Sequence, residues 1–95
     1  NKFAHDAELR FKAQARRNKA LGLWAASLLG KTGAEAEAYA AEVVKADLEE
    51  AGEEDVFRKV RGDFDAAGVD QSDHQIRRQM AELLVAAAEQ IEKEA

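Results

Sequence analysis

The sequence contains no cysteine and no proline, and it has one tryptophan, one tyrosine and six glycines among 95 residues. The absence of cysteine excludes a disulfide framework and a thiolate metal site. The absence of proline removes the strongest helix breaker, and alanine is abundant, so the composition favours helix throughout. No apolar run approaches the roughly 18 residues of a membrane span, and no signal peptide is visible. We therefore expect an all-α protein with no direct membrane insertion.

Catalytic motifs are also missing. The two histidines, His5 and His74, lie far apart in the sequence, and there is no glycine-rich phosphate loop, H-E-x-x-H motif or nucleophile motif. Asp70 and Asp73 lie close to His74, but they form an incomplete ligand set, and acids are typical of a helix N-terminus. We predict a protein that is not an enzyme and has no catalytic residue, metal site or cofactor.

The charge of the chain is uneven. The length allows one domain, and the formal net charge is −5. Residues 1–31 carry seven basic against two acidic residues, whereas residues 32–95 carry seven against seventeen, so the balances are +5 and −10. A basic arm on an acidic body indicates an arm that binds an acidic or mixed surface, or that folds back on its own body.

Glycines mark the expected ends of the helices. Gly30 suits the left-handed position that follows a helix, and Gly52 and Gly68 are expected to end two further helices. The spacing predicts helices over residues 1–29, 32–51, 53–67, and from residue 72 nearly to the C-terminus.

Two capping boxes are expected at helix starts. Thr32 and Glu35 form a T-x-x-E pattern, and Ser72 and Gln75 form an S-x-x-Q pattern. The acidic residues 53–55 place negative charge at the start of the third helix, where the helix dipole favours it.

Apolar residues recur at intervals of three and four in each predicted helix, which indicates four amphipathic helices packed as a small bundle. Trp24 and Tyr39 could line a ligand pocket, but we favour core positions for both. The predicted core stripes contain the following residues: Leu21, Trp24, Leu28 and Leu29; Ala36, Tyr39, Ala40, Val43, Val44 and Leu48; Val56, Phe57, Val60, Phe64 and Ala67; Ile76, Met80, Leu83, Leu84, Ala87 and Ile91.

The first half of the N-terminal helix breaks this pattern. Phe3, Ala7 and Phe11 share one face by i, i+4, i+8 spacing, and Leu9 lies off it. Five bases and no acid follow between residues 10 and 19: Arg10, Lys12, Arg16, Arg17 and Lys19. Such a face is suited to a groove on a partner protein. The alternatives are a generic helical interaction module that self-associates through this arm, a solvated face paired with the body's own acids, and nucleic-acid binding, which the acidic body opposes.

Three blocks of the sequence resemble the zeta-type inhibitor of the F-type ATP synthase of alphaproteobacteria, a family earlier catalogued as a domain of unknown function. They are FAHDAELRFKAQARRNKALGLWAA, GAEAEAYAAEVVKADLEEAGEEDVFRKVRGDFDAAG and SDHQIRRQMAELL. The resemblance implies a four-helix bundle with a mobile N-terminal arm. It also implies that the arm inserts between catalytic subunits of the enzyme head, which contains alpha, beta and gamma subunits, at an interface near the central rotor, and blocks ATP hydrolysis. It further implies a protein that is monomeric when free, cytoplasmic, and peripheral on the inner membrane through the synthase.

The resemblance also implies where the partner-binding residues lie. In the family the inhibitory segment begins upstream of the position of Asn1, and the chain starts with asparagine, so we expect a fragment or a processed form. Residues 1–12 correspond to the C-terminal part of the arm, and residues 13–95 correspond to the bundle of a single helical domain. The implied partner-binding residues are Asn1, Lys2, Phe3, His5, Asp6, Leu9, Arg10, Phe11 and Lys12.

Overall fold

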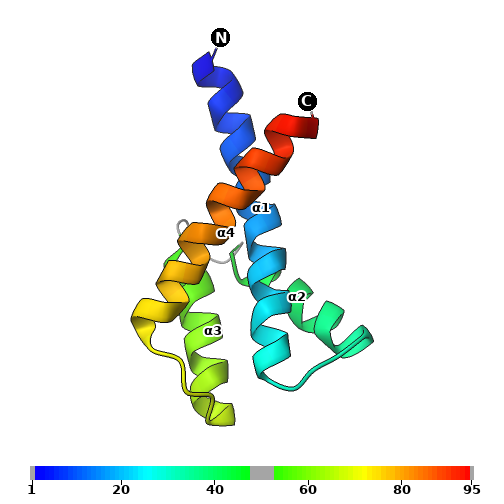
Figure 1. Cartoon of the computed structure of the whole chain (residues 1–95), viewed down its shortest axis with the longest axis vertical. Coiled ribbons are helices and arrows are strands. Elements are labelled where there is room, and N and C mark those ends of the chain that lie inside the picture. Colours follow the sequence, from blue (N-terminus) through cyan, green and yellow to red (C-terminus); the bar gives the residue numbers. More distant parts are fainter. Residues whose placement is uncertain (1, 48–52, 95) are drawn as a thin grey trace.

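The computed structural model describes residues 2–47 and 53–94, and this part of the chain contains four α-helices and no strand (Figure 1). The prediction of an all-α four-helix bundle is confirmed. None of the described helices is long and apolar enough to cross a membrane. The helices are α1 (Lys2–Leu28), α2 (Ala34–Ala46), α3 (Glu54–Ala67) and α4 (Asp73–Glu94).

Helix α1 is the central helix of the bundle. It is the longest helix, with 27 residues, and it packs most extensively against α2 and α4 and less extensively against α3. Figure 1 shows its C-terminal half among the other helices and its N-terminal part extending past α2 and α3. Helix α4 crosses α1 and then diverges from it, so both chain ends lie at the same end of the molecule.

The core is formed where the apolar stripes of the four helices meet. Leu21, Val43, Val60, Phe64 and Ile76 have no exposed surface. This arrangement follows from the i, i+3, i+4 spacing, which brings each apolar stripe to one side of its helix. The cluster also contains Ala25, Ala26, Tyr39, Val56, Phe57 and Met80.

The two aromatic residues singled out in the sequence differ in burial. Tyr39 is 3% exposed, and its hydroxyl donates a 2.8 Å hydrogen bond to Asp63. Trp24 is only half-buried and packs against the core, with its ring edge-on to Phe64 at a centroid distance of 5.7 Å. Leu28, predicted to be core, is 39% exposed because it lies at the last position of α1.

Helices α1 and α2 approach one another closely at Gly22. A Cβ atom on Gly22 would lie 2.6 Å from the Cα of Ala40 and 3.3 Å from the Cβ of Val43. Helices pack this closely only where the side chains between them are small. Ala25 and Ala26 continue this small surface along α1, and both are fully buried.

The predicted glycine stops at Gly30 and Gly68 are confirmed. Their φ angles are 79° and 72°, in the left-handed region. At the end of α1 the Lys31 amide donates to the Ala26 carbonyl at 2.8 Å, and at the end of α3 the Val69 amide donates to the Phe64 carbonyl at 2.9 Å. Both ends are therefore Schellman motifs, which satisfy carbonyls that a helix end leaves free.

The capping boxes give a mixed result. Ser72 and Gln75 form the predicted reciprocal pair, in which each backbone amide donates to the other residue's side chain. The prediction of a capping box at Thr32 is wrong, because α2 begins at Ala34 and its N-cap residue is Gly33. Gly33 has a φ of 56°, and no side chain caps the helix. The backbone turns through this glycine, which displaces Thr32 from the capping position.

The end of α2 also differs from the prediction. The helix ends at Ala46 rather than near residue 51, and Asp47 is its C-cap residue. Its buried residues are Tyr39, Ala40 and Val43, and none of the three residues after Val43 in the helix is buried. The apolar pattern therefore predicts that the helix exists but does not locate its last residue. The predicted stop at Gly52 and the predicted core residue Leu48 lie outside the described residues.

Candidate partner-binding site

The candidate site is the N-terminal part of α1, which extends beyond α2 and α3 (Figure 1). This segment contains no glycine or proline before Gly22, so α1 runs without interruption from the arm into the bundle. Among the predicted partner-binding residues, Asn1 lies outside the described part of the chain. Lys2, Phe3, His5 and Asp6 occupy the first turns of α1, and the side chains that can be described begin at Ala7.

The arm has two different faces. Phe11 is 71% exposed, the largest exposed fraction among the large hydrophobic side chains of the described residues. Leu9 precedes Phe11 by two residues and therefore points about 200° away around the helix. Leu9 is half-buried and lines a groove with Ala13 and with residues of α4. The bundle partly covers Leu9 and leaves Phe11 exposed. The sequence spacing predicts only that the two residues lie on different faces of the helix.

The basic residues of α1 fall into different environments. Arg10 and Lys19 are exposed, and Lys12, 60% exposed, lies 3.4 Å from Glu8 one turn earlier. Arg16 makes two hydrogen bonds, of 2.6 and 3.1 Å, with the Glu94 carboxylate. These bonds lower the pKa of Glu94 and join the last turn of α4 to α1.

Arg17, one of the five bases between residues 10 and 19, is buried in the bundle. Arg17 and Asn18 are each 1% exposed. The Arg17 Nε donates to the Asn18 Oδ1 at 2.7 Å, and its Nη1 donates to Glu53 at 3.0 Å. Arg17 lies four residues from Ala13 and from Leu21, which are also buried, and this i, i+4 spacing is the sequence signal that identifies its position.

The buried guanidinium gives a prediction about stability. Glu53→Ala removes the carboxylate and leaves the Arg17 cation buried, which is costly. Because Glu53 is 58% exposed, solvent screening reduces the effect, and we expect the free energy of unfolding to fall by about 1–2 kcal/mol. Urea denaturation measures this change.

Arg17→Met provides the matched control. An apolar side chain of similar length needs no ion pair, so this variant should retain parental stability within about 1 kcal/mol. In the Arg17→Met background, Glu53→Ala should have almost no further effect. A full loss of stability in that background would show that the Glu53 effect does not pass through Arg17.

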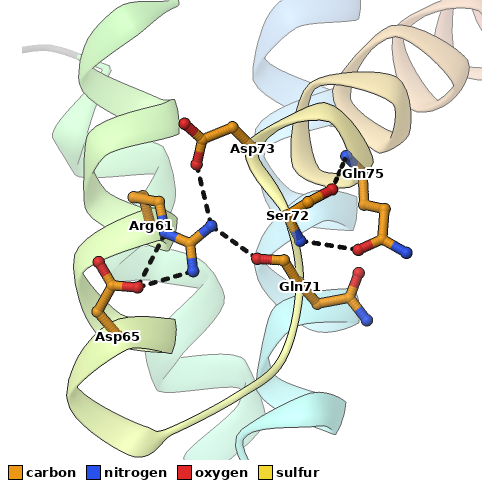
Figure 2. A network of polar contacts seen from close by, with 6 residues as sticks. All are labelled: Arg61, Asp65, Gln71, Ser72, Asp73 and Gln75. Carbon is orange, nitrogen blue, oxygen red and sulfur yellow. Dashed lines mark hydrogen bonds and ion pairs between the residues drawn. The ribbon is translucent and has the colours of Figure 1, made fainter.

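The connection between α3 and α4 was the other segment with candidate ligand residues. Figure 2 shows Arg61 at its centre, donating to Asp65, to Asp73 and to the backbone carbonyl of Gln71, the last two at 3.0 and 2.7 Å. The Asp73 carboxylate thus binds a guanidinium that also holds the loop. Across residues 2–47 and 53–94, no group of three His, Cys, Asp or Glu residues is placed to hold a metal ion.

A polar hollow between α2 and α3 has a volume of about 330 Å³. Three of its four charged side chains bind each other, since Lys59 lies 2.8 Å from Glu42 and 2.9 Å from Asp63; the fourth is Lys31. Burial, together with the hydrogen bond to Asp63, raises the pKa of Tyr39 well above its ordinary value. This network holds α2 against α3 and occupies Glu42, Lys59, Asp63 and the Tyr39 hydroxyl.

The fold and the site define the class of protein, a small all-α bundle with a candidate partner-binding helix. The chain belongs to the family of the ATPase inhibitor subunit zeta, whose model matches residues 1–90. It is also similar to a protein solved by solution NMR, with 53% sequence identity and a TM-score of 0.79 over 92% of this chain and 99% of that chain. No curated protein sequence matches the chain.

Proposed function

We propose that this protein inhibits ATP hydrolysis by the F-type ATP synthase, and that the N-terminal part of α1 docks on the catalytic head. The family is named for an inhibitor subunit of an ATPase, which is a regulatory role and supports the expectation that the chain is not an enzyme. The observation that carries the proposal is Phe11, a large apolar side chain that is 71% exposed on a helix otherwise rich in charge. Such anchors dominate the affinity of helix-in-groove complexes.

The proposed mechanism follows from the shape of α1. The arm would enter the interface between an alpha and a beta subunit near the gamma subunit, with Phe3 and Phe11 on its apolar face. Arg10 and Lys12 would bind carboxylates at the rim, where charge pairs add specificity and speed of association. The arm would stop this rotary enzyme if the interface accepts it in one rotor position and its presence prevents rotation to the next position. The protein would act as a monomer from the cytoplasmic side, bound to the membrane only through the synthase.

Nucleic-acid binding receives less support. Of the five bases between residues 10 and 19, Arg16 binds Glu94 and the buried Arg17 binds Glu53. The remaining basic charge lies next to a body with a balance of −10, which repels a polyanion.

The proposal predicts the effect of Phe11→Ala. In the full-length protein we expect the concentration that gives half-maximal inhibition of the purified ATPase head to rise about tenfold, because a buried anchor contributes 1 kcal/mol or more to binding. The measurement is ATP hydrolysis during titration with the inhibitor. Circular dichroism should remain parental, since Phe11 contributes little to the bundle.

Leu28→Ala is the matched control. Leu28 is also an exposed apolar residue of α1, but it lies at the opposite end of the helix, and its loss should leave inhibition unchanged. Equal inhibition by the parent and Phe11→Ala would refute the anchor role of Phe11. A parent protein that fails to inhibit the head at all would refute the proposed function.

A further inference from the structure

An apolar groove lies where α1 and α4 begin to diverge. It has a volume of about 280 Å³, and its lining residues are Leu9, Arg10, Ala13, Leu84 and Ala88. Four of these five residues are apolar, in contrast to the charged hollow between α2 and α3. The groove is therefore suited to an apolar side chain rather than to a polar small molecule.

The flank of α4 beside this groove is also apolar. Val85 is 61% exposed and lies three residues from Ala88, so the two are neighbours on the helix surface. Phe11, Leu28 and Val85 are the large hydrophobic residues that are exposed within the described part of the chain. Phe11 lies on the arm itself, and Val85 lies on α4 beside the groove. Both are therefore close to the candidate site.

Arg10 supplies the charge at the edge of the groove. Its neighbours Lys12 and Arg16 have acidic partners in Glu8 and Glu94. Arg10 is exposed and makes no ion pair with any residue whose side chain is described (7–47 and 53–94). An exposed guanidinium beside an apolar groove complements a carboxylate on a partner, because Arg binds carboxylates through two parallel hydrogen bonds.

We propose that this groove is a second docking site for the catalytic head, and that it accepts a large apolar side chain with a carboxylate next to it. The inference rests on the proposed function and extends it from α1 to α4. The apolar side chain lies between Leu9 and Ala13 of α1 and Leu84 and Ala88 of α4, and the carboxylate binds Arg10.

The site exists only while α1 and α4 are packed together, since each helix supplies part of its lining. The bidentate pair between Arg16 and Glu94 also joins the two helices, three residues after Ala13 in α1 and six residues after Ala88 in α4. The head therefore binds the folded bundle together with the arm, and the bundle adds affinity that the arm lacks by itself. The Phe11 face remains available, because it lies on the other side of α1.

Two α4 substitutions test the groove. Val85→Glu and Ala88→Glu each introduce a negative charge into the apolar contact with the partner. This charge also lies near the partner's carboxylate and repels it. In the full-length protein we expect each to raise the half-inhibiting concentration about tenfold, or about 1.4 kcal/mol. Val85→Glu changes an exposed side chain, so it keeps the test valid even if Ala88→Glu disturbs the fold.

Gln90→Glu is the matched control. It introduces the same charge two residues beyond Ala88, at an exposed position about 200° around the helix from Ala88. Parental inhibition by Gln90→Glu and weakened inhibition by Val85→Glu would support the groove. Equal inhibition by the parent and all of these variants would overturn the groove proposal and leave the proposed function intact. An equal loss of inhibition in Val85→Glu and Gln90→Glu would have the same meaning. A parent without inhibition would overturn both.

Discussion

Phe64→Ala should lower the free energy of unfolding by about 3–5 kcal/mol, the range for loss of a buried phenylalanine. Phe64 has no exposed surface and lies in the core cluster, where it contacts the edge of Trp24. The substitution leaves a cavity that the surrounding helices fill only in part. For a domain of this size, a change of several kcal/mol is a large share of the total stability, and urea denaturation followed by circular dichroism measures it.

Phe11→Ala is the control for this substitution. It removes the same side chain from a position that is 71% exposed, and we expect a change within about 0.5 kcal/mol. Similar unfolding curves for the two variants would contradict the assigned core. The pair also separates stability from inhibition, since Phe11→Ala is expected to affect only inhibition.

Gly22→Val should lower the free energy of unfolding by about 3 kcal/mol, at the upper end of the range for overpacked sites. The obstacle is backbone, because a Cβ at this position would meet the Cα of Ala40 at 2.6 Å. The α1–α2 contact would have to open, which separates Ala25 from its neighbours as well. Thermal unfolding monitored by circular dichroism measures the loss.

Gly62→Val provides the matched control. Gly62 is also inside a helix, but no atom lies within 4 Å of the Cβ that a side chain would add there. Valine has a slightly higher helix propensity than glycine, so we expect this variant to differ from the parent by less than about 0.5 kcal/mol. A loss of stability at Gly62 equal to that at Gly22 would show that helix propensity, rather than the close approach of α1 and α2, decides the result.

The architecture could be predicted from local sequence signals. The absence of proline, the apolar stripes and the left-handed glycines at Gly30 and Gly68 are properties of a few adjacent residues, and all are found in the structure. The two failures have different causes. At the start of α2 the cause is local, because Gly33, with a φ of 56°, takes the N-cap position in place of Thr32. At Gly22 the cause is tertiary, because its role depends on Ala40 in another helix.

The candidate site was predictable only in part. Helical spacing correctly separated the Phe11 face from Leu9, since both positions follow from the helix period. Charge alone could not reveal that Arg17 is buried, because its partner Glu53 lies 36 residues away in the sequence. The groove also escaped prediction, since it requires the approach of Leu84 and Ala88 on α4 to the base of the arm.

The unbroken course of α1 has a mechanical consequence. The helix that carries the arm is the same helix that holds Gly22 against α2 and supplies Leu21 to the core. A force on the arm is therefore transmitted along one continuous helix to the close contact between α1 and α2 at Gly22, with no glycine or proline before Gly22 to act as a hinge. A partner that held the arm rigidly would thereby also fix the orientation of the whole bundle.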